Sequence, residues 1–317
     1  MRHGWVWLLS LQLSFSVPAL AETFSMPPEG ADLIGAPRSV EARQEDTLLD
    51  IARAHSLGYE EITKSNPGVD PWMPGAGVSV FLPKQRILPR APREGIVINL
   101  PEHRLYYFGT ARNGEPAQIH SYPVAIGKMD WNTPLGVTRI TQKVKNPTWT
   151  PPQSVREARA RQGEILPPVV PPGPDNPLGH RAMRLAIPGG AYLIHGTNRP
   201  AGIGMQATAG CMRLYPEDIE KLFDMVPVNT KVNIVNQPLK LGWLDGVLYV
   251  EVHPALQEDA VEPPQLTDLT RLVVEATRET LTPVDWTRVQ QAFREARGVP
   301  VAVSAGAAMV VSRGSDR

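Results

Sequence analysis

The residues with the clearest chemical potential are the only cysteine of the chain, Cys211, and a histidine 16 positions before it, His195. A thiol reacts as its thiolate, and an unperturbed cysteine has a pKa of about 8.5, so it needs a base or a nearby cation. A neutral His195 can accept the proton, and Arg213 can supply positive charge. Gly210 permits positive φ, and the N–H groups of Gly210 and Cys211 are placed to stabilise an oxyanion. This pattern predicts nucleophilic catalysis by a cysteine–histidine pair.

The composition of the chain limits the alternatives. The 317 residues are 42% hydrophobic, which is enough for a sizeable core. Basic and acidic side chains number 32 each, so charge gives no support for binding nucleic acid. A lone cysteine with scattered histidines lacks the spacing of metal ligands, and we expect no metal and no cofactor. The alternative for Cys211 is a buried, inert side chain.

The N-terminal segment predicts export. Arg2 precedes a mostly apolar stretch at residues 5–17, and Ala19-Leu20-Ala21 has the small residues of a peptidase cleavage site. The apolar stretch is too short to cross a hydrocarbon core about 30 Å thick. We therefore interpret residues 1–21 as a signal peptide, with a mature chain that begins at Glu22 and has no transmembrane segment.

Residues 94–236 are predicted to form the main domain, mostly of β-strands. Short runs alternate apolar and polar residues between turns, as half-buried strands do. One or two helices are expected, the clearest from Pro216 to Met225. Nine prolines fall between Asn146 and His180, so this segment is neither a helix nor a central strand throughout, and we expect a long functional loop.

Residues 39–84 are predicted to form a small unit in the order strand, helix, helix, strand. Thr47 and Asp50 are spaced as a capping box at the start of the first helix. Together with the turns Asn66-Pro67-Gly68 and Pro74-Gly75, the unit resembles a LysM domain. That resemblance implies binding of N-acetylglucosamine-containing glycans such as peptidoglycan, and we expect the unit to supply avidity.

The remaining segments are assigned from composition and turn signals. Residues 22–38 are rich in proline, glycine and small side chains and are interpreted as a linker. Residues 239–302 predict a small α+β appendage, with Asp245-Gly246 as the turn of a hairpin. Residues 303–317 are expected to be a disordered tail.

Several short motifs together resemble the signature of the YkuD-type L,D-transpeptidases. They are His195-Gly196-Thr197, Ile203-Gly204, Thr208-x-Gly210-Cys211-x-Arg213, Thr133-Pro134-x-Gly136, Asn146-Pro147-x-Trp149-x-Pro151-Pro152 and Asp175-Asn176-Pro177-Leu178-Gly179. Gram-negative members with an N-terminal LysM domain have this order and a similar C-terminal appendage. The resemblance implies a β-sandwich or barrel with one or two helices, and a periplasmic location.

The resemblance also implies roles for the catalytic residues. Cys211 would attack the carbonyl before the terminal D-alanine of a stem tetrapeptide, releasing D-alanine and forming a thioester. His195 would be the general base, oriented by the backbone carbonyl of Gly196. The N–H groups of Gly210 and Cys211 would form the oxyanion hole, and the family's sensitivity to carbapenems would apply.

Three further residues are expected at the substrate: Arg213, Thr208 and Thr197. Thr208 stands where many members have serine, which keeps the hydroxyl. Ala209 stands where many members have histidine, so a second catalytic histidine is not expected here.

The acceptor and the reaction class stay open at this point. The expected partners are peptidoglycan stem peptides and glycan strands, with no nucleic acid. An amine would resolve the thioester, with a lysine of an outer-membrane lipoprotein favoured and a neighbouring stem peptide, giving a 3→3 crosslink, next. The alternatives are an L,D-carboxypeptidase of the cell wall, in which water replaces the amine, and a non-catalytic LysM glycan-binding protein.

Overall fold

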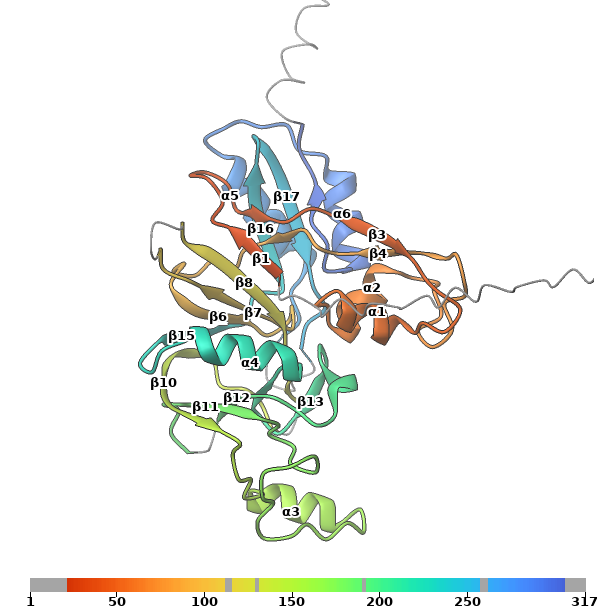
Figure 1. Ribbon diagram of the computed structural model, residues 1–317. Helices are drawn as coiled ribbons and strands as arrows, with labels where there is room; N and C mark the ends of the chain where they lie inside the picture. Colours follow the sequence, from red (N-terminus) through yellow and green to blue (C-terminus); the bar gives the residue numbers. More distant parts are fainter. Residues whose placement is uncertain (1–21, 112–115, 129–130, 190–191, 257–261, 306–317) are drawn as a thin grey trace, which may run out of the picture.

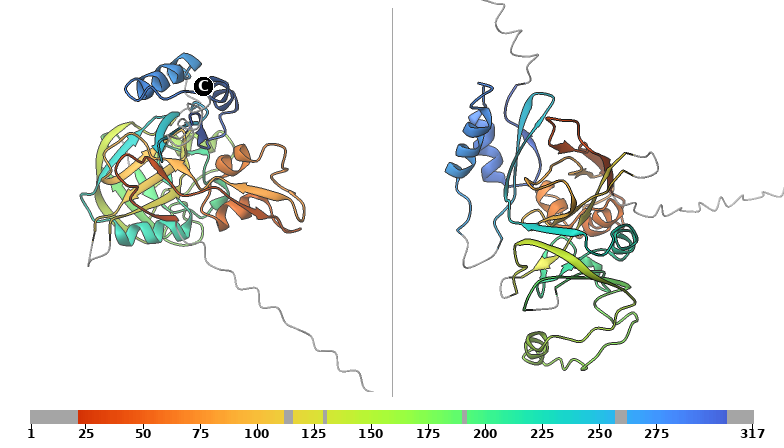
Figure 2. Two further views of the ribbon diagram at one scale, coloured as in Figure 1. Left: turned by 90° about the horizontal axis from the view of Figure 1, so that it is seen from above. Right: turned by 90° about the vertical axis from the view of Figure 1, so that its left-hand side faces the viewer.

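The computed structural model describes residues 22–111, 116–128, 131–189, 192–256 and 262–305 (Figure 1). The predicted signal peptide and most of the predicted tail lie outside these residues. A long sheet forms the centre of the molecule, with the βααβ unit on one side and the C-terminal unit on another (Figures 1 and 2). No helix within these ranges has the length and apolar character needed to cross a membrane.

The central sheet has nine strands in the order β1-β8-β7-β6-β15-β10-β11-β12-β14. These are β1 (Glu22–Ser25), β6 (Gly95–Asn99), β7 (Arg104–Phe108), β8 (Gln118–Pro123), β10 (Gly136–Lys145), β11 (Arg181–Leu185), β12 (Leu193–His195), β14 (Met212–Arg213) and β15 (Lys231–Val235). Pairs β6–β15 and β12–β14 are parallel and the others are antiparallel. The short strands β9 (Ile126–Gly127) and β13 (Gln206–Thr208) pair in parallel beside it.

Both faces of the sheet are buried at β6, β7 and β8, because these strands carry apolar residues on alternate sides. In β6, Ile96 and Ile98 belong to one hydrophobic cluster while Val97 belongs to another. Helix α4 (Pro216–Met225) adds Ile219 and Leu222 to the first cluster. The prediction of a mainly β domain with one or two helices is confirmed.

The proline-rich segment contains one short helix, α3 (Gln153–Ala160), and none of its residues is buried. It projects from the end of the molecule opposite the C-terminal helices (Figures 1 and 2). The base of the segment is held by Asn176, which is fully buried. The Asn176 side-chain amide donates to the carbonyls of Pro147, at 2.8 Å, and Pro171, at 3.1 Å. One asparagine thus fastens both ends of an otherwise exposed arm.

The βααβ unit has the predicted element order. It consists of β3 (Arg38–Glu41), α1 (Leu48–Ala54), α2 (Tyr59–Ser65) and β4 (Ser79–Leu82), with β3 and β4 antiparallel. The predicted capping box is present. The Asp50 N–H donates to Thr47 Oγ1 at 3.1 Å, and the Thr47 N–H donates to the Asp50 carboxylate at 3.1 Å. Its core is separate from that of the central sheet.

Residues 22–38 differ from the expected linker. Strand β1 is an edge strand of the central sheet, and β2 (Leu33–Ile34) pairs with β5 (Arg86–Ile87). Both residues of β2 are buried. The surrounding prolines and glycines dominate the composition of the segment and conceal these short apolar pairs, which become strands only where a partner lies beside them.

The C-terminal unit follows the prediction closely. A sheet of β16 (Leu239–Leu244), β17 (Val247–Val252) and β18 (Val301–Ala302) packs against α5 (Leu266–Thr277) and α6 (Trp286–Glu295). Asp245 and Gly246 have φ of 51° and 73°, as a type I′ hairpin turn requires. Val303, within the expected tail, is fully buried in this core.

Candidate active site

Strand register brings the three candidate reactive residues together. In the parallel pair β12–β14, His195 lies opposite Arg213 and Ile194 lies opposite Met212. Cys211 directly precedes β14, two positions from Arg213. Side chains two positions apart on a strand point to the same face. His195 and Arg213 are therefore neighbours on adjacent strands, and Cys211, 16 positions from His195 in sequence, lies at the start of the same strand pair.

The backbone next to His195 assigns its tautomer. Nδ1 lies 2.6 Å from the carbonyl oxygen of Gly196, and a carbonyl only accepts hydrogen bonds. Nδ1 therefore carries the proton, which leaves the lone pair of Nε2 available to act as a base. This is the contact between His195 and Gly196 that the family resemblance implies.

His195 is neutral in this environment. Burial, followed by the positive charge of Arg213, lowers the pKa of the imidazole to about 3. The carbonyls of Gly196 and Leu178 act in the opposite direction but do not outweigh burial. His195 is 3% exposed, so its ring is available as a proton acceptor only to a group inside the site.

Cys211 is also held in its neutral form. Burial raises the pKa of the thiol, although the backbone N–H of Leu193 and the charge of Arg213 lower it. The positive charge of Arg213, expected from the sequence to favour the thiolate, is present, but desolvation outweighs it. Arg213 instead keeps His195 unprotonated and favours the thiolate as it forms.

The loop before Cys211 is fixed by Thr133, a buried residue of the Thr133-Pro134-x-Gly136 motif. Its hydroxyl donates to the carbonyl of Gly210 at 3.1 Å and accepts from the N–H of Gly127 at 3.1 Å. A trans peptide is planar, with its N–H pointing opposite to its C=O. Thr133 therefore sets the direction of the Cys211 N–H, which belongs to the same peptide as the Gly210 carbonyl. Gly210 has φ of +91°, which only glycine adopts readily.

Thr208 and Thr197, expected at the substrate, are both buried and both bonded to nearby backbone. The Thr208 hydroxyl donates to the carbonyl of Cys211 at 2.6 Å. The Thr197 hydroxyl accepts from the N–H of Arg199 at 2.9 Å. These contacts hold the loops on either side of the reactive pair.

Arg213 has hydrogen-bonding capacity left over. Its Nε is buried and has no hydrogen-bond partner among the described residues. An unpaired buried donor costs free energy unless a further group completes it. The donor is consistent with a substrate oxygen binding beside Cys211.

Sequence reasoning missed three contributors to the site: Thr133, Leu193 and Leu178. Thr133 and Leu178 were both within quoted motifs, so a signal for each existed, but motif membership alone did not indicate which atom either would contact. Leu193 and Leu178 act through backbone atoms, which side-chain identity does not report.

One group among the described residues has potential metal ligands close together: Glu102, Glu251 and His253. The ammonium of Lys240 occupies the space between the carboxylates, at 2.8 Å from Glu102 and 2.7 Å from Glu251. This group is therefore an ion-pair cluster, and it lies at the junction with the C-terminal unit.

A cysteine beside a neutral, oriented histidine in a mainly β domain is typical of a thiol-dependent acyl-transfer enzyme. Residues 93–234 match the family model YkuD, described as the L,D-transpeptidase catalytic domain. The chain belongs to the L,D-transpeptidase family, and we call residues 93–234 its catalytic domain.

Relatives of nearly the same length support this assignment. The chain is 44% identical over 262 residues to the probable L,D-transpeptidase YcfS of Escherichia coli, covering 81% of each chain. It is 38% identical over 311 residues to the probable L,D-transpeptidase ErfK/SrfK of the same organism, covering 94% of this chain and 96% of the relative. A solved catalytic domain of an E. faecium L,D-transpeptidase matches 46% of this chain and 100% of its own at 19% identity, with a TM-score of 0.32.

Proposed function

We propose that this enzyme uses Cys211 to cleave the bond before the terminal D-alanine of a peptidoglycan stem tetrapeptide and transfers the acyl group to an amine. The observation that carries the proposal is the position of His195 opposite Arg213, beside Cys211, with Nδ1 bonded to the Gly196 carbonyl. The alternative of an inert cysteine does not account for a base, a cation and a backbone loop arranged around one thiol.

The first step begins from a neutral thiol and a neutral imidazole. As Sγ attacks the substrate carbonyl, its proton passes to Nε2 of His195, and the C–S bond forms while the carbonyl oxygen becomes an oxyanion. The N–H groups of Gly210 and Cys211 stabilise that oxyanion. The imidazolium then protonates the leaving amine, D-alanine departs, and a thioester remains on Cys211.

The second step is aminolysis of this thioester. An unprotonated primary amine attacks, His195 takes its proton, and the thiol is released as the new amide forms. Arg213, with its unpaired Nε, binds an oxygen of the donor substrate, while Thr208 and Thr197 hold the surrounding loops. The same thioester attacked by water would give a carboxypeptidase.

The other parts of the proposal concern location and partners. Residues 1–21 direct export, residues 39–84 form a LysM module that binds glycan strands, and the enzyme works in the periplasm. Among acceptors we favour a lysine of an outer-membrane lipoprotein over a second stem peptide. The reason is the arrangement along the chain, in which a LysM unit is followed by the catalytic domain and then by the C-terminal unit. Carbapenems are expected to acylate Cys211, giving a one-to-one adduct in intact-protein mass spectrometry that Cys211→Ser does not form.

The central test measures D-alanine release from a soluble tetrapeptide. Cys211→Ala and His195→Ala are each expected to lower the rate by at least about 10⁴-fold, with the double variant little worse than either, because the pair acts as a unit. A matched control is His120→Ala, which removes a half-buried histidine from β8. Release that survives in Cys211→Ala would refute the assignment.

The pH profile of the wild type provides a second test. Because the pKa of His195 is about 3, the base stays unprotonated down to roughly pH 4. The rate is expected to show no inflection near pH 6.5, the ordinary value for histidine. An inflection there that disappears in His195→Ala would contradict the environment described for His195.

The acceptor is tested by offering the enzyme tetrapeptide-bearing sacculi with either a lysine-ended lipoprotein or no protein acceptor. Coupling to the lipoprotein supports the favoured acceptor. Efficient 3→3 dimer formation without coupling would favour crosslinking, and free tripeptide alone would indicate a carboxypeptidase.

A further inference from the structure

The turn between α1 and α2 of the βααβ unit packs directly against the catalytic domain. We infer that this turn, through Gly58, is a positioning element of the catalytic centre, because it holds the loop Ile203–Gly204 that leads into the nucleophile. The inference rests on the proposed role of Cys211, and it gives the βααβ unit a task beyond the avidity expected from sequence.

Two glycines from different units meet backbone to backbone. A Cβ built on Gly58 would lie 2.7 Å from the Cα of Gly204, and a Cβ on Gly204 would lie 2.4 Å from the Cα of Gly58. Contacts this short exclude any side chain at either position. Gly58 has an ordinary negative φ of −89°, so the neighbouring chain, and not its own backbone conformation, excludes a side chain there.

Backbone hydrogen bonds join the same segments. The N–H of Tyr59 donates to the carbonyl of Ile203 at 3.0 Å, and the N–H of Glu60 donates to the carbonyl of Gly204 at 3.3 Å. These are first-turn amides of α2, which have no partner within their own helix. The loop of the catalytic domain supplies the acceptors that this helix end needs.

Side chains of the catalytic domain bind the carbonyls of the same turn. Arg104 donates to the Ser56 carbonyl at 3.1 Å, and the Tyr215 hydroxyl donates to the Leu57 carbonyl at 3.1 Å. Tyr215 also packs with Ile203 in one small buried cluster. The turn is therefore held on both its N–H and its C=O groups.

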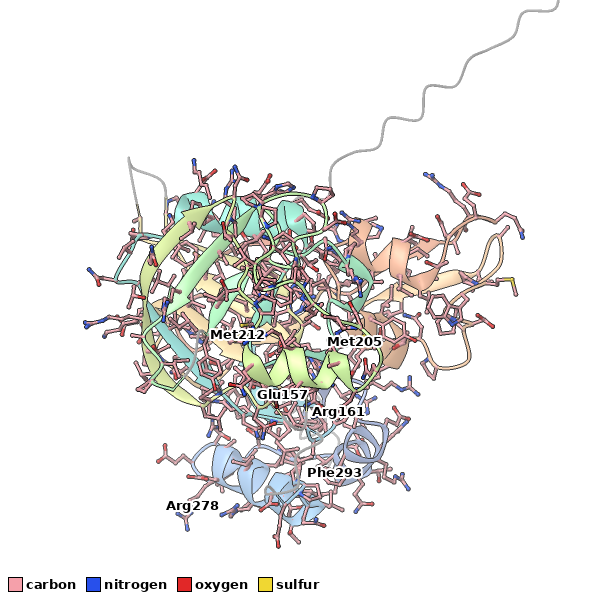
Figure 3. All side chains as sticks on the ribbon, turned by 90° about the horizontal axis from the view of Figure 1, so that it is seen from below. Glu157, Arg161, Met205, Met212, Arg278 and Phe293 are labelled. Carbon is pink, nitrogen blue, oxygen red and sulfur yellow. The ribbon has the colours of Figure 1, made fainter. Side chains whose placement is uncertain are left out.

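The held loop is connected to the nucleophile by a short segment that is hydrogen-bonded at Met205 and Thr208. Met205 follows Gly204, and its carbonyl accepts from the N–H of Ile126 at 3.1 Å. Strand β13 comes next, and its last residue, Thr208, donates to the carbonyl of Cys211. Figure 3 shows Met205 beside the orange βααβ unit, and Met212 further into the catalytic domain. Gly204 lies only seven positions before Cys211, so a displacement of its backbone can be transmitted to the nucleophile through a short segment.

The test compares two glycine-to-alanine variants in the full-length protein. Gly58→Ala places a methyl group against Gly204. Gly202→Ala is the matched control, because it adds the same methyl group directly before the loop Ile203–Gly204, where the nearest atom is the Cβ of Ala207 at an ordinary 3.9 Å. Thermal melting establishes that each variant is folded.

Two measurements report on the position and the accessibility of Cys211. For Gly58→Ala we expect kcat for D-alanine release from a soluble tetrapeptide to fall at least about tenfold, while KM changes less than about threefold. The reason is that moving a reacting group by about 1 Å lowers the rate of the chemical step strongly. Alkylation of Cys211, the only thiol, by iodoacetamide is expected to rise at least about threefold as the site loosens. Gly202→Ala should stay within about twofold of wild type in both.

Hydrogen exchange on the wild type tests the contact without any substitution. The amides of Tyr59 and Glu60 are expected to exchange about as slowly as that of Ile62 within α2, because both are bonded to the catalytic domain. Fast exchange at both, as at a free helix end, would overturn the inference. So would folded Gly58→Ala with wild-type kcat and alkylation rate, or equal losses in Gly202→Ala. If the wild type releases no D-alanine, the proposed function fails, while alkylation and exchange still decide this inference.

Discussion

The catalytic domain is joined to a smaller unit on each side, and the two junctions are built differently. At the N-terminal junction, Arg104 and Arg86 are almost fully buried and pair with Glu61 and Glu22 at 2.7–3.2 Å. Although burial opposes it, the two arginines hold the pKa of Glu61 below its usual range. Beside this cluster the α1–α2 turn contacts the loop that leads to Cys211.

At the C-terminal junction a single cation is shared. The three N–H groups of Lys240 are matched by Glu102, Glu251 and the carbonyl of Ile87, at 2.8, 2.7 and 2.6 Å. Glu251 also accepts from the N–H of Ile87 at 2.7 Å. The groups bound here belong to the turn between β6 and β7, the C-terminal hairpin and β5, and none of them leads into the nucleophile loop.

Similar buried ion pairs have different roles at the two junctions, according to the backbone segment that each one holds. Both junctions satisfy buried charge with several partners, as burial demands. Only the N-terminal one is continuous with a catalytic loop. Substitutions at the N-terminal junction are therefore expected to lower both stability and activity, whereas substitutions at the C-terminal junction should lower stability alone.

The largest effect is expected for Arg104→Met at the N-terminal junction. The change removes one of the two arginines that pair with Glu61 and also the hydrogen bond to the Ser56 carbonyl, and breaking a buried pair costs about 3–5 kcal/mol. Urea unfolding should show this loss, and D-alanine release by the folded fraction should fall as well. Unchanged activity in the folded protein would separate this junction from catalysis.

Lys240→Met is expected to destabilise the protein comparably, by about 3–5 kcal/mol, because it removes the ammonium group that lies between the buried carboxylates of Glu102 and Glu251. Here kcat and the alkylation rate of Cys211 should remain at wild-type values. The control is Lys231→Met, which breaks an exposed pair with Glu94 and should cost about 0.5 kcal/mol or less. A tenfold loss of kcat in Lys240→Met would erase the contrast between the junctions.

Thr133→Val tests the backbone next to the nucleophile directly. The variant keeps the shape but removes the hydroxyl that orients the Gly210 carbonyl, and a loss of about tenfold in kcat with little change in KM is expected. Thr138→Val is a suitable control, since its hydroxyl is buried and has no hydrogen-bond partner among the described residues. Steady-state kinetics of both variants measure the difference, and equal effects would argue against an orienting role.

The smallest effect is expected for Asp218→Asn, next to Glu217 at the start of α4. Burial, and then the charge of Glu217, raises the pKa of Asp218 to about 7. The native state therefore holds a proton that the unfolded chain loses near pH 4, so this residue costs stability as the pH rises through 7. Asn should raise the Tm by roughly 2–3 °C at pH 8 and by almost nothing at pH 4. A gain of equal size at both values would mean that ionisation is not the cause.

Much of this molecule was predictable from local signals. The capping box at Thr47 and Asp50, the helix from Pro216 to Met225 and the hairpin at Asp245-Gly246 depend on residues close in sequence, and all were predicted correctly. The Cys211 and His195 motifs likewise stand out in the chain. The motifs do not, however, predict the protonation states of Cys211 and His195.

Tertiary structure alone decided three features. Strands β1 and β2 exist because partners from distant segments lie beside them, whereas their own composition resembles a linker. His195 and Cys211 are neutral because burial outweighs Arg213, and burial depends on the whole fold. Gly58 contacts Gly204 because two separately encoded units dock. Local patterns determine elements and residue types, but desolvation and backbone approach arise only when elements far apart in sequence pack together.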